Sequence, residues 1–178
     1  MTIRLTNAQR TVPVNLPELN RLARRAARSL RIRQRGAMEI TFIDERRMRR
    51  LNQQFLSHDR PTDVLSFRYD LPAAPQRVSR GTAQAGAGAV PERVVGEILI
   101  APQQARRYAR AHGLSYREEL SRYVVHGLLH WLGHEDRTPA EQQHMRRRED
   151  KLLSSCMTRR GNGKTAARAP GPRPPAPR

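Results

Sequence analysis

Hydrophobic patterns follow one another along the chain in an order that restricts the possible folds. Alternating apolar runs typical of strands lie at residues 3–5, 38–44, 63–69 and 94–101. Stretches with apolar residues at helical spacing follow the first and the second of these runs, and three more follow the fourth. This order of strand, helix, strand, helix, two strands and three helices predicts an α+β fold, with a four-stranded mixed sheet and helices packed mainly on one face.

Capping side chains mark where the predicted helices begin. A short polar side chain can accept a hydrogen bond from a backbone N–H of the first helical turn and therefore favours that position. The candidates are Asn15, Asp44, Ser115 and Thr138, the last two followed three residues later by a glutamate, as in a capping box. The expected helices are 17–30, 44–55, 102–111, 115–133 and 138–154.

Arginine dominates the charge of the chain. The 34 Lys+Arg against 16 Asp+Glu give a formal net charge of +18, and only Lys151 and Lys164 are lysines. Arginine binds phosphate through a planar fork of donors, so this composition favours a nucleic-acid partner, although a genome-wide bias toward arginine predicts the same surplus. Aromatic residues make up only 4% of the chain, which argues against a protein that binds single strands mainly by base stacking.

Other features of the composition argue against membrane and secreted proteins. The chain has no run of about 18 apolar residues, and no apolar N-terminal stretch followed by a small-residue cleavage site. Its single cysteine, Cys156, cannot form an internal disulfide. We therefore expect a cytoplasmic protein with no membrane anchor and no disulfide-linked partner.

The C-terminal end differs in composition from the rest of the chain. Residues 159–178 are rich in proline, glycine and arginine and contain no large apolar side chain, so burial cannot offset the entropy lost on ordering them. We expect one domain over residues 1–158 and a disordered basic tail over 159–178. Within the domain, the segment between the third and fourth strands is predicted to be a loop rich in glycine, alanine and proline.

The segment that carries chemistry is YVVHGLLHWLGHED, near the end of the domain. His126 and His130 lie one helical turn apart on one face, so both imidazoles can reach a common ion. Gly133 can take the positive φ that ends the helix and returns the chain toward that ion. The third ligand then comes from the turn. Asp136 is favoured because the spacing H-x3-H-x2-G-x2-D is that of metzincin-type zinc peptidases, and His134 is the alternative.

Apolar neighbours favour metal binding as the role of these histidines. The surrounding VVHGLLHWLG predicts buried imidazoles, and a buried polar group without a partner costs about 1–3 kcal/mol. Two imidazoles and one carboxylate leave a fourth position for water, which is typical of catalytic zinc. We therefore expect one Zn²⁺ per chain.

The same helix offers candidate catalytic residues. In HExxH peptidases the glutamate after the first histidine is the general base, but Gly127 stands in its place here, which argues against proteolysis. Glu119, seven residues before His126, lies on about the same helical face and could accept a proton or orient a ligand. An ion pair with Arg122 is the structural alternative for Glu119. His126 and Glu119 are thus the candidate catalytic residues.

Two linked motifs resemble the YbeY-type rRNA maturation factors, a family of bacterial single-strand-specific metallo-endoribonucleases. LNQQFLSHDRPTDVLSF, residues 51–67, is similar to the family pattern N-x-x-[YF]-R-x-x-D-x-P-T-D-V-L-S-F, and HGLLHWLGHED, residues 126–136, is similar to H-G-x-L-H-L-x-G-Y-D-H. The resemblance covers about residues 37–153. It implies a zinc ion held by three ligands and a cytoplasmic location. It also implies action on the 3′ end of small-subunit rRNA and in ribosome quality control, with single-stranded RNA and ribosomal particles as partners.

Two departures from the family pattern bear on activity. The third ligand of the family is usually histidine, and Asp136 at that position lowers the positive charge of the site, so a zinc-bound water would be less acidic. Leu56 stands where the family has an arginine that is used in RNA cleavage. Arg60 and Arg68 are candidates to supply the missing charge and bind RNA.

Three functions are compatible with this sequence. The favoured one is a zinc-dependent endoribonuclease acting on single-stranded RNA, with either hydroxide or the RNA 2′-OH as nucleophile. A noncatalytic ribosome-assembly factor with a structural zinc is the second, and the two departures favour it. A metallopeptidase is the third, and it lacks a base at Gly127.

Overall fold

The four predicted strands pair into one mixed sheet in a computed structural model that describes residues 1–56, 62–69 and 92–157. β1, β2 and β4 are parallel to one another, and β3 runs antiparallel to β4 at one edge of the sheet. The strands lie in the order β1-β2-β4-β3 and comprise β1 (Thr2–Asn7), β2 (Ala37–Phe42), β3 (Val64–Arg68) and β4 (Val94–Ile100). The α+β class and the four-stranded mixed sheet are confirmed.

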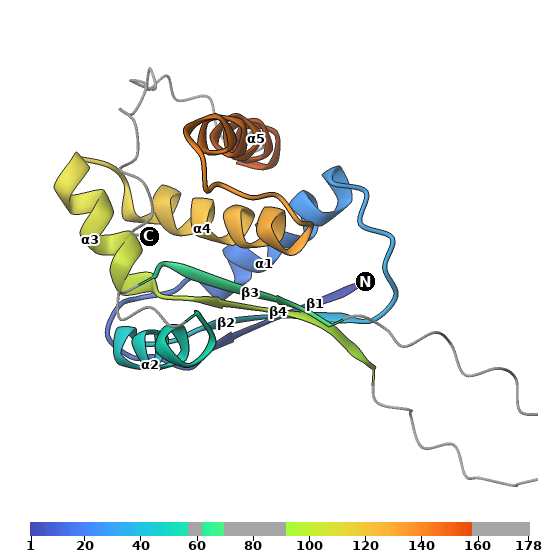
Figure 1. Ribbon diagram of the computed structural model, residues 1–178, viewed down its shortest axis with the longest axis horizontal. Helices are drawn as coiled ribbons and strands as arrows, with labels where there is room; N and C mark the ends of the chain where they lie inside the picture. The colour runs from blue at the N-terminus through green and yellow to red at the C-terminus, as the bar shows by residue number, and fades with distance from the viewer. Residues whose placement is uncertain (57–61, 70–91, 158–178) are drawn as a thin grey trace, which may run out of the picture.

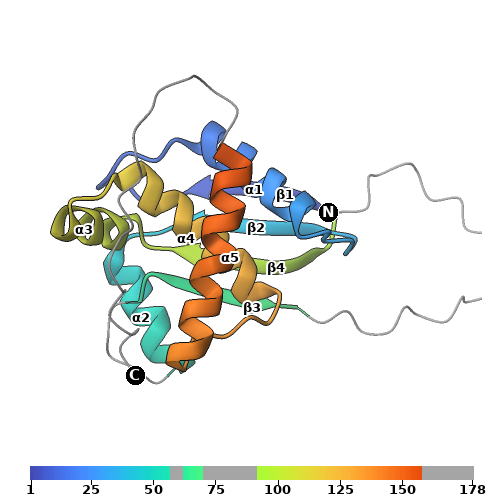
Figure 2. The ribbon, with the colours of Figure 1, turned by 90° about the horizontal axis from the view of Figure 1, so that it is seen from above.

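The helices cover the two faces of the sheet unequally. Figure 1 shows α1 (Leu16–Ser29) and α4 (Tyr116–Trp131) on one face, with α5 (Pro139–Met157) on the outer side of α4. α3 (Pro102–His112) packs beside α4, and α2 (Glu45–Leu56) covers the opposite face. Figure 2 shows α5 crossing over α4. The helices are therefore packed mainly on one face, as predicted.

α4 is buried on nearly every side because it lies between the sheet and α5. Val124, Val125, Leu128 and Leu129 have no exposed surface and belong to the main core. A smaller core lies under α2, where Met48 packs against residues of β3 and β4. The two cores explain the apolar sequence of β4, which is an inner strand covered by helices on both faces.

The predicted caps begin four of the helices. The backbone N–H three residues later donates to each capping oxygen, which is Asn15 Oδ1 (3.2 Å), Asp44 Oδ1 (2.8 Å), Ser115 Oγ (3.4 Å) or Thr138 Oγ1 (3.3 Å). The helix ends agree closely with the predictions except for α5, which continues to Met157 instead of ending near residue 154. Leu152, Leu153 and Cys156 are buried there, and tertiary packing of this apolar face sustains the last turn.

A glycine allows α4 to approach the strands closely. A Cβ added to Gly127 would lie 2.5 Å from Ile98 Cγ2 and 3.1 Å from Val64 Cγ1, so a side chain there would push the helix away from the sheet. Ser66 Oγ of β3 donates to the Gly127 carbonyl oxygen at 3.0 Å. The motif over residues 51–67 is thereby joined to the helix that carries the histidines.

Some predictions concern residues outside the described ranges. These are the loop between β3 and β4, Arg60, and the basic tail over 159–178. Within the described ranges, no helix combines the length and the apolar character needed to cross a bilayer. Cys156 is buried in α5, and as the single cysteine of the chain it has no partner for an internal disulfide.

Candidate metal centre

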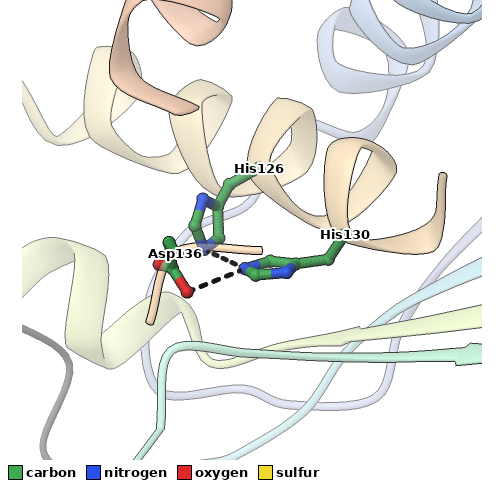
Figure 3. Close-up of side chains that lie close together, drawn as sticks. All are labelled: His126, His130 and Asp136. Carbon is green, nitrogen blue, oxygen red and sulfur yellow. Dashed lines mark hydrogen bonds and ion pairs between the residues drawn. The ribbon is translucent and has the colours of Figure 1, made fainter. Parts of the chain in front are cut away.

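Two histidines of α4 meet on one side of the helix. His126 and His130 are one turn apart, and their Nε2 atoms lie 2.9 Å from each other, with the two rings at 88°. His126 is 5% exposed, and His130 is half-buried. Figure 3 shows the two rings approaching each other in the space beside the helix.

The chain turns back after α4 and brings a carboxylate to this pair. Gly133, at φ 88°, takes the left-handed conformation that glycine adopts readily. The His134 N–H then donates to the Leu129 carbonyl oxygen at 3.0 Å, which ends the helix. Asp136 lies beside both imidazoles (Figure 3): Oδ2 is 3.8 Å from the first Nε2, and Oδ1 is 3.7 Å from the second. The three favoured ligands are therefore side by side.

This group has the donor atoms and the size of a metal site. One ligand atom from each residue lies within 4.8 Å of the other two. In a tetrahedral zinc site with bonds of 2.0–2.2 Å, two ligand atoms are about 3.4 Å apart, and the separations here, 2.9, 3.7 and 3.8 Å, lie on both sides of this value. Two imidazole nitrogens and a carboxylate oxygen can therefore bind one divalent cation with a fourth position open.

A buried carboxylate behind the site orients His126. Glu149 of α5 is 3% exposed, and its Oε1 lies 2.7 Å from His126 Nδ1. Burial raises the pKa of Glu149, but the hydrogen bonds and charges of His126 and Arg122 outweigh burial and lower it to about 2. Because an ionised carboxylate can only accept, Nδ1 carries a proton, and Nε2 of the neutral imidazole keeps its lone pair for a metal ion.

Arg122 connects this carboxylate to Glu119, the predicted catalytic candidate. Its guanidinium lies 2.9 Å from Glu149 Oε2, 2.7 Å from Asp150 Oδ1 and 3.9 Å from Glu119 Oε2. Burial lowers the pKa of Arg122, but hydrogen bonds and charges from Glu149 and Asp150 outweigh burial and raise it. Glu119, 3% exposed, thus forms an ion pair with Arg122, which is the structural alternative to a catalytic role. A catalytic role for Glu119 stays a prediction.

The environment of His130 favours its neutral form. Burial and then the neighbouring His126 lower the pKa of His130, against the smaller opposing effects of Asp136, Glu135 and Asp63. The neutral imidazole is the form that binds metal ions. The effect of Asp63 also indicates that the T-D-V-L-S-F motif lies near this centre.

His134, the alternative third ligand, has a different neighbour. A guanidinium nitrogen of Arg148 lies 3.2 Å from its Nε2 and donates to it. Burial, Arg148 and His144 lower the pKa of His134. Among the described residues, the ligand group contains Asp136 and not His134.

Arg68, predicted to bind RNA, is exposed at the end of β3. Its guanidinium carbon lies 5.8 Å from the centre of the Trp131 ring, which is a cation–π distance. Trp131 directly follows His130 in α4, so Arg68 lies on the same face of the sheet as the metal centre. RNA binding stays a prediction for Arg68, and also for Arg60, which is outside the described ranges.

The sequence-based prediction missed Glu149, although its position carries a signal. Met145, Leu152 and Cys156 are buried in α5, and Glu149 lies on the same face, between the first two. A charged residue within an apolar stripe requires a buried partner. This rule could have pointed to a carboxylate directed at the helix that carries the histidines.

The sequence of this chain is similar to those of known proteins. A family model described as Endoribonuclease YbeY matches residues 4–157. A curated protein of that description from Salinibacter ruber is 37% identical over 120 residues, which are 67% of this chain and 70% of that protein. Another, from Thermobifida fusca, is 33% identical over 145 residues, which are 80% of this chain and 86% of that protein.

A solved structure has a similar fold. The solution structure of a protein from Thermotoga maritima superimposes with a TM-score of 0.53 and 23% sequence identity. The similarity covers 87% of this chain and 89% of that one. The arrangement of sheet and helices is therefore found in an experimental structure as well.

Proposed function

Because the chain belongs to the YbeY family of endoribonucleases, we propose that it cleaves phosphodiester bonds within single-stranded RNA with one Zn²⁺ held by His126, His130 and Asp136. The family supports nuclease action on RNA, and the ligand group supports a metal ion. We further propose that the protein acts in the cytoplasm on ribosomal particles, where it matures the 3′ end of small-subunit rRNA and serves ribosome quality control.

The observation that carries this proposal is the ligand group together with the carboxylate behind it. Because Glu149 fixes the proton of His126 on Nδ1, the opposite nitrogen presents a lone pair to the same point as the Asp136 carboxylate. When both imidazoles are neutral, His126 Nε2 and the Asp136 carboxylate oxygens carry lone pairs and no proton. His130 Nε2 is then the one atom of this group that can carry a proton. The centre therefore has an excess of lone pairs, which a cation satisfies.

The residues of the chain have separate tasks in such a reaction. A zinc ion bound there supplies a Lewis acid that polarises a phosphoryl oxygen of the scissile bond. Arg122 and Glu149 hold His126 in one orientation and one protonation state. The side chains of His130 and Asp136 are 24% and 25% exposed, so RNA can approach the centre from their side. Arg68 offers positive charge to the phosphates of the RNA.

The position of Gly127 argues against a peptidase. An HExxH-type mechanism needs a carboxylate at this position. A Cβ at Gly127 would be directed at Ile98 of the sheet, 2.5 Å away, and not at the metal ligands. A glutamate there could not serve as the base without separating α4 from the sheet.

The activity is tested with an RNA oligonucleotide offered as a single strand and as a duplex to the zinc-loaded protein. We expect cleavage of the single strand, and a loss of more than roughly 100-fold in rate when His126 or His130 is replaced by alanine, because each removes a ligand. His112→Ala, which changes an exposed histidine of α3, is the control and should cleave normally. Cleavage that persists in both ligand variants would refute the proposal.

The ribosomal role is tested in cells. A strain whose only copy carries His130→Ala should accumulate small-subunit rRNA with an unprocessed 3′ end, which sequencing of rRNA ends detects. The same strain with His112→Ala should have mature ends. Mature 3′ ends in the His130→Ala strain would show that the protein acts on other RNA.

A further inference from the structure

A basic surface lies at the end of α1 and in the turn that leads to β2. Between Glu18 and Glu39 the chain has seven arginines and no acidic residue. Four of these arginines are exposed side chains near the end of this segment. They are Arg28, Arg31, Arg33 and Arg35, which we call the α1–β2 arginine cluster.

The carboxylates that bracket this segment are engaged by other arginines. Glu18 pairs with Arg117, and Glu39 lies 3.7 Å from Arg4. Within the part of the chain that the structure describes, no carboxylate forms an ion pair with a member of the cluster. The cluster therefore presents its positive charge to the solvent.

The backbone holds one of these arginines in a conformation that favours glycine. Arg31 has φ 53° and is the one non-glycine residue with positive φ in the described ranges. The Arg31 N–H donates to the Arg28 carbonyl oxygen at 3.0 Å, and the Ile32 N–H donates to the Ala27 carbonyl oxygen at 3.1 Å. In helix ends with this pair of hydrogen bonds, glycine usually occupies the position of Arg31. At the end of α3 that position is Gly113, with φ 65°. An arginine in so unfavourable a conformation suggests a use for its side chain.

The segment that carries the cluster is anchored at both ends. Leu30 and Ile32 pack against the main core. At the start of β2, the Gly36 carbonyl oxygen accepts from Thr2 N–H at 2.9 Å, and a Cβ on Gly36 would lie 2.5 Å from the Arg93 carbonyl oxygen. The guanidinium groups thus project from a well-held backbone, which reduces the entropy lost when they bind a ligand.

The cluster and the candidate metal centre lie over different strands of the sheet. α1 packs on β1, whereas α4 is bonded to β3 through Ser66, and β1 and β3 are the two edge strands (Figure 2). The turn of the cluster leads into β2, which is two strand spacings, about 10 Å, from β3. A single ligand that reaches both surfaces must be extended and carry negative charge along its length, as RNA does.

We propose that the α1–β2 arginine cluster binds the phosphate backbone of RNA outside the cleaved segment, so that long or structured RNA binds more tightly than short oligonucleotides. The proposal rests on the RNA-cleaving function proposed above. RNA fits better than a membrane surface because the cluster contains no exposed large apolar side chain for insertion into lipid: Ile32 is half-buried, and Phe55 and Tyr69 are the exposed large apolar residues among those described.

The test is the salt dependence of binding to a structured rRNA fragment. The cluster variant is Arg31→Gln/Arg33→Gln/Arg35→Gln, and the matched control, which also replaces three exposed arginines, is Arg10→Gln/Arg106→Gln/Arg110→Gln. The slope of log affinity against log salt should decrease in magnitude by about 2 in the cluster variant, because each phosphate that is no longer neutralised contributes about 0.7. In the control the slope should decrease by less than about 1. Both variants should cleave a short single-stranded oligonucleotide at the wild-type rate.

A single substitution excludes misfolding as an explanation. Arg31→Gly removes the side chain and suits the positive φ, so its melting temperature should equal or exceed that of the wild type, while its salt slope decreases by about 0.7–0.9. The proposal would be overturned by a wild-type slope in both the triple cluster variant and Arg31→Gly. It would also be overturned by a control variant whose slope decreases as much as that of the triple cluster variant. A cluster variant that loses binding to phosphatidylglycerol vesicles but retains binding to RNA would overturn it as well. Failure of the wild type to cleave the short oligonucleotide would instead refute the proposed function, because the slopes measure binding without cleavage.

Discussion

One proton determines whether His126 can bind a metal ion. With Glu149 ionised and 2.7 Å from Nδ1, the proton stays on that nitrogen, and Nε2 is available as a ligand when the imidazole is neutral. Arg122, 2.9 Å from the other carboxylate oxygen, keeps Glu149 charged although it is buried. If His126 binds a metal ion as proposed, Glu149 is a positioning residue that acts on this ligand from another helix.

Replacing Glu149 with glutamine should weaken zinc binding roughly 10- to 100-fold, because a neutral amide holds the Nδ1 proton of His126 less firmly. Competition with a chromophoric chelator measures this affinity. The control is Asp150→Asn, which changes an exposed neighbour that contacts the same Arg122 but not the histidine, and it should retain wild-type affinity. Equal affinity in wild type and Glu149→Gln would contradict the positioning role.

Glu149 should also make the metal-free protein sensitive to acid. Its pKa in the folded state is about 2, below the ordinary 4.5, so its charged form stabilises the fold above pH 4.5, and this contribution is lost as the pH falls toward 2. The full shift corresponds to roughly 3 kcal/mol. Chemical denaturation at pH 7 and pH 3 should therefore show a larger loss of stability for the wild type than for Glu149→Gln. The same loss in both proteins would be evidence against this carboxylate as a source of acid sensitivity.

The elements of this fold could be predicted where local chemistry determines them. Asn15, Asp44 and the two later caps begin helices through contacts within one turn, and spacing alone places His126 and His130 on one face. Glu149 could not be placed in this way, since its contact with His126 joins residues 23 apart in different helices. The pairing of such helices depends on tertiary packing, which periodicity within one element does not contain.

The contact between α4 and the sheet should be intolerant of any side chain at Gly127. Gly127→Ala places a methyl group 2.5 Å from Ile98 Cγ2, and overpacking of this kind destabilises by roughly 1–3 kcal/mol. Urea denaturation measures the loss. Ser66→Ala, which removes the hydrogen bond to Gly127 without a clash, should cost about 1 kcal/mol. An unchanged urea midpoint for Gly127→Ala would show that α4 can move away from the sheet at little cost.

In the molecule as a whole, the metal centre joins parts that are already packed. The candidate ligands come from α4 and from the connection to α5, and Glu149 comes from α5 itself. The core around α4 is formed by apolar side chains, among which Val124 and Leu128 are fully buried by protein. A bound cation should therefore add stability to a fold that forms without it.

Removal of zinc by a chelator should lower the melting temperature but leave the helix content nearly unchanged. A metal present at 100 times its dissociation constant stabilises the folded state by about 2.7 kcal/mol, and this amount is lost on chelation. Thermal melts and far-ultraviolet circular dichroism, with and without chelator, measure the two effects. Unfolding on chelation would contradict this expectation by showing that the fold requires the metal ion. An unchanged melting temperature would contradict it by showing that the metal ion does not stabilise the fold.

We propose above all that Asp136 completes a catalytic zinc centre with His126 and His130. The most direct measurement is zinc content per chain and the rate of single-stranded RNA cleavage, determined on the same preparations of wild type, Asp136→Ala, Asp136→His and His134→Ala. One zinc ion and full cleavage are expected in the wild type and in His134→Ala, loss of both in Asp136→Ala, and recovery of zinc in Asp136→His, because imidazole can replace the carboxylate as a ligand. Full zinc content and cleavage in Asp136→Ala, or loss of both in His134→Ala, would contradict the claim.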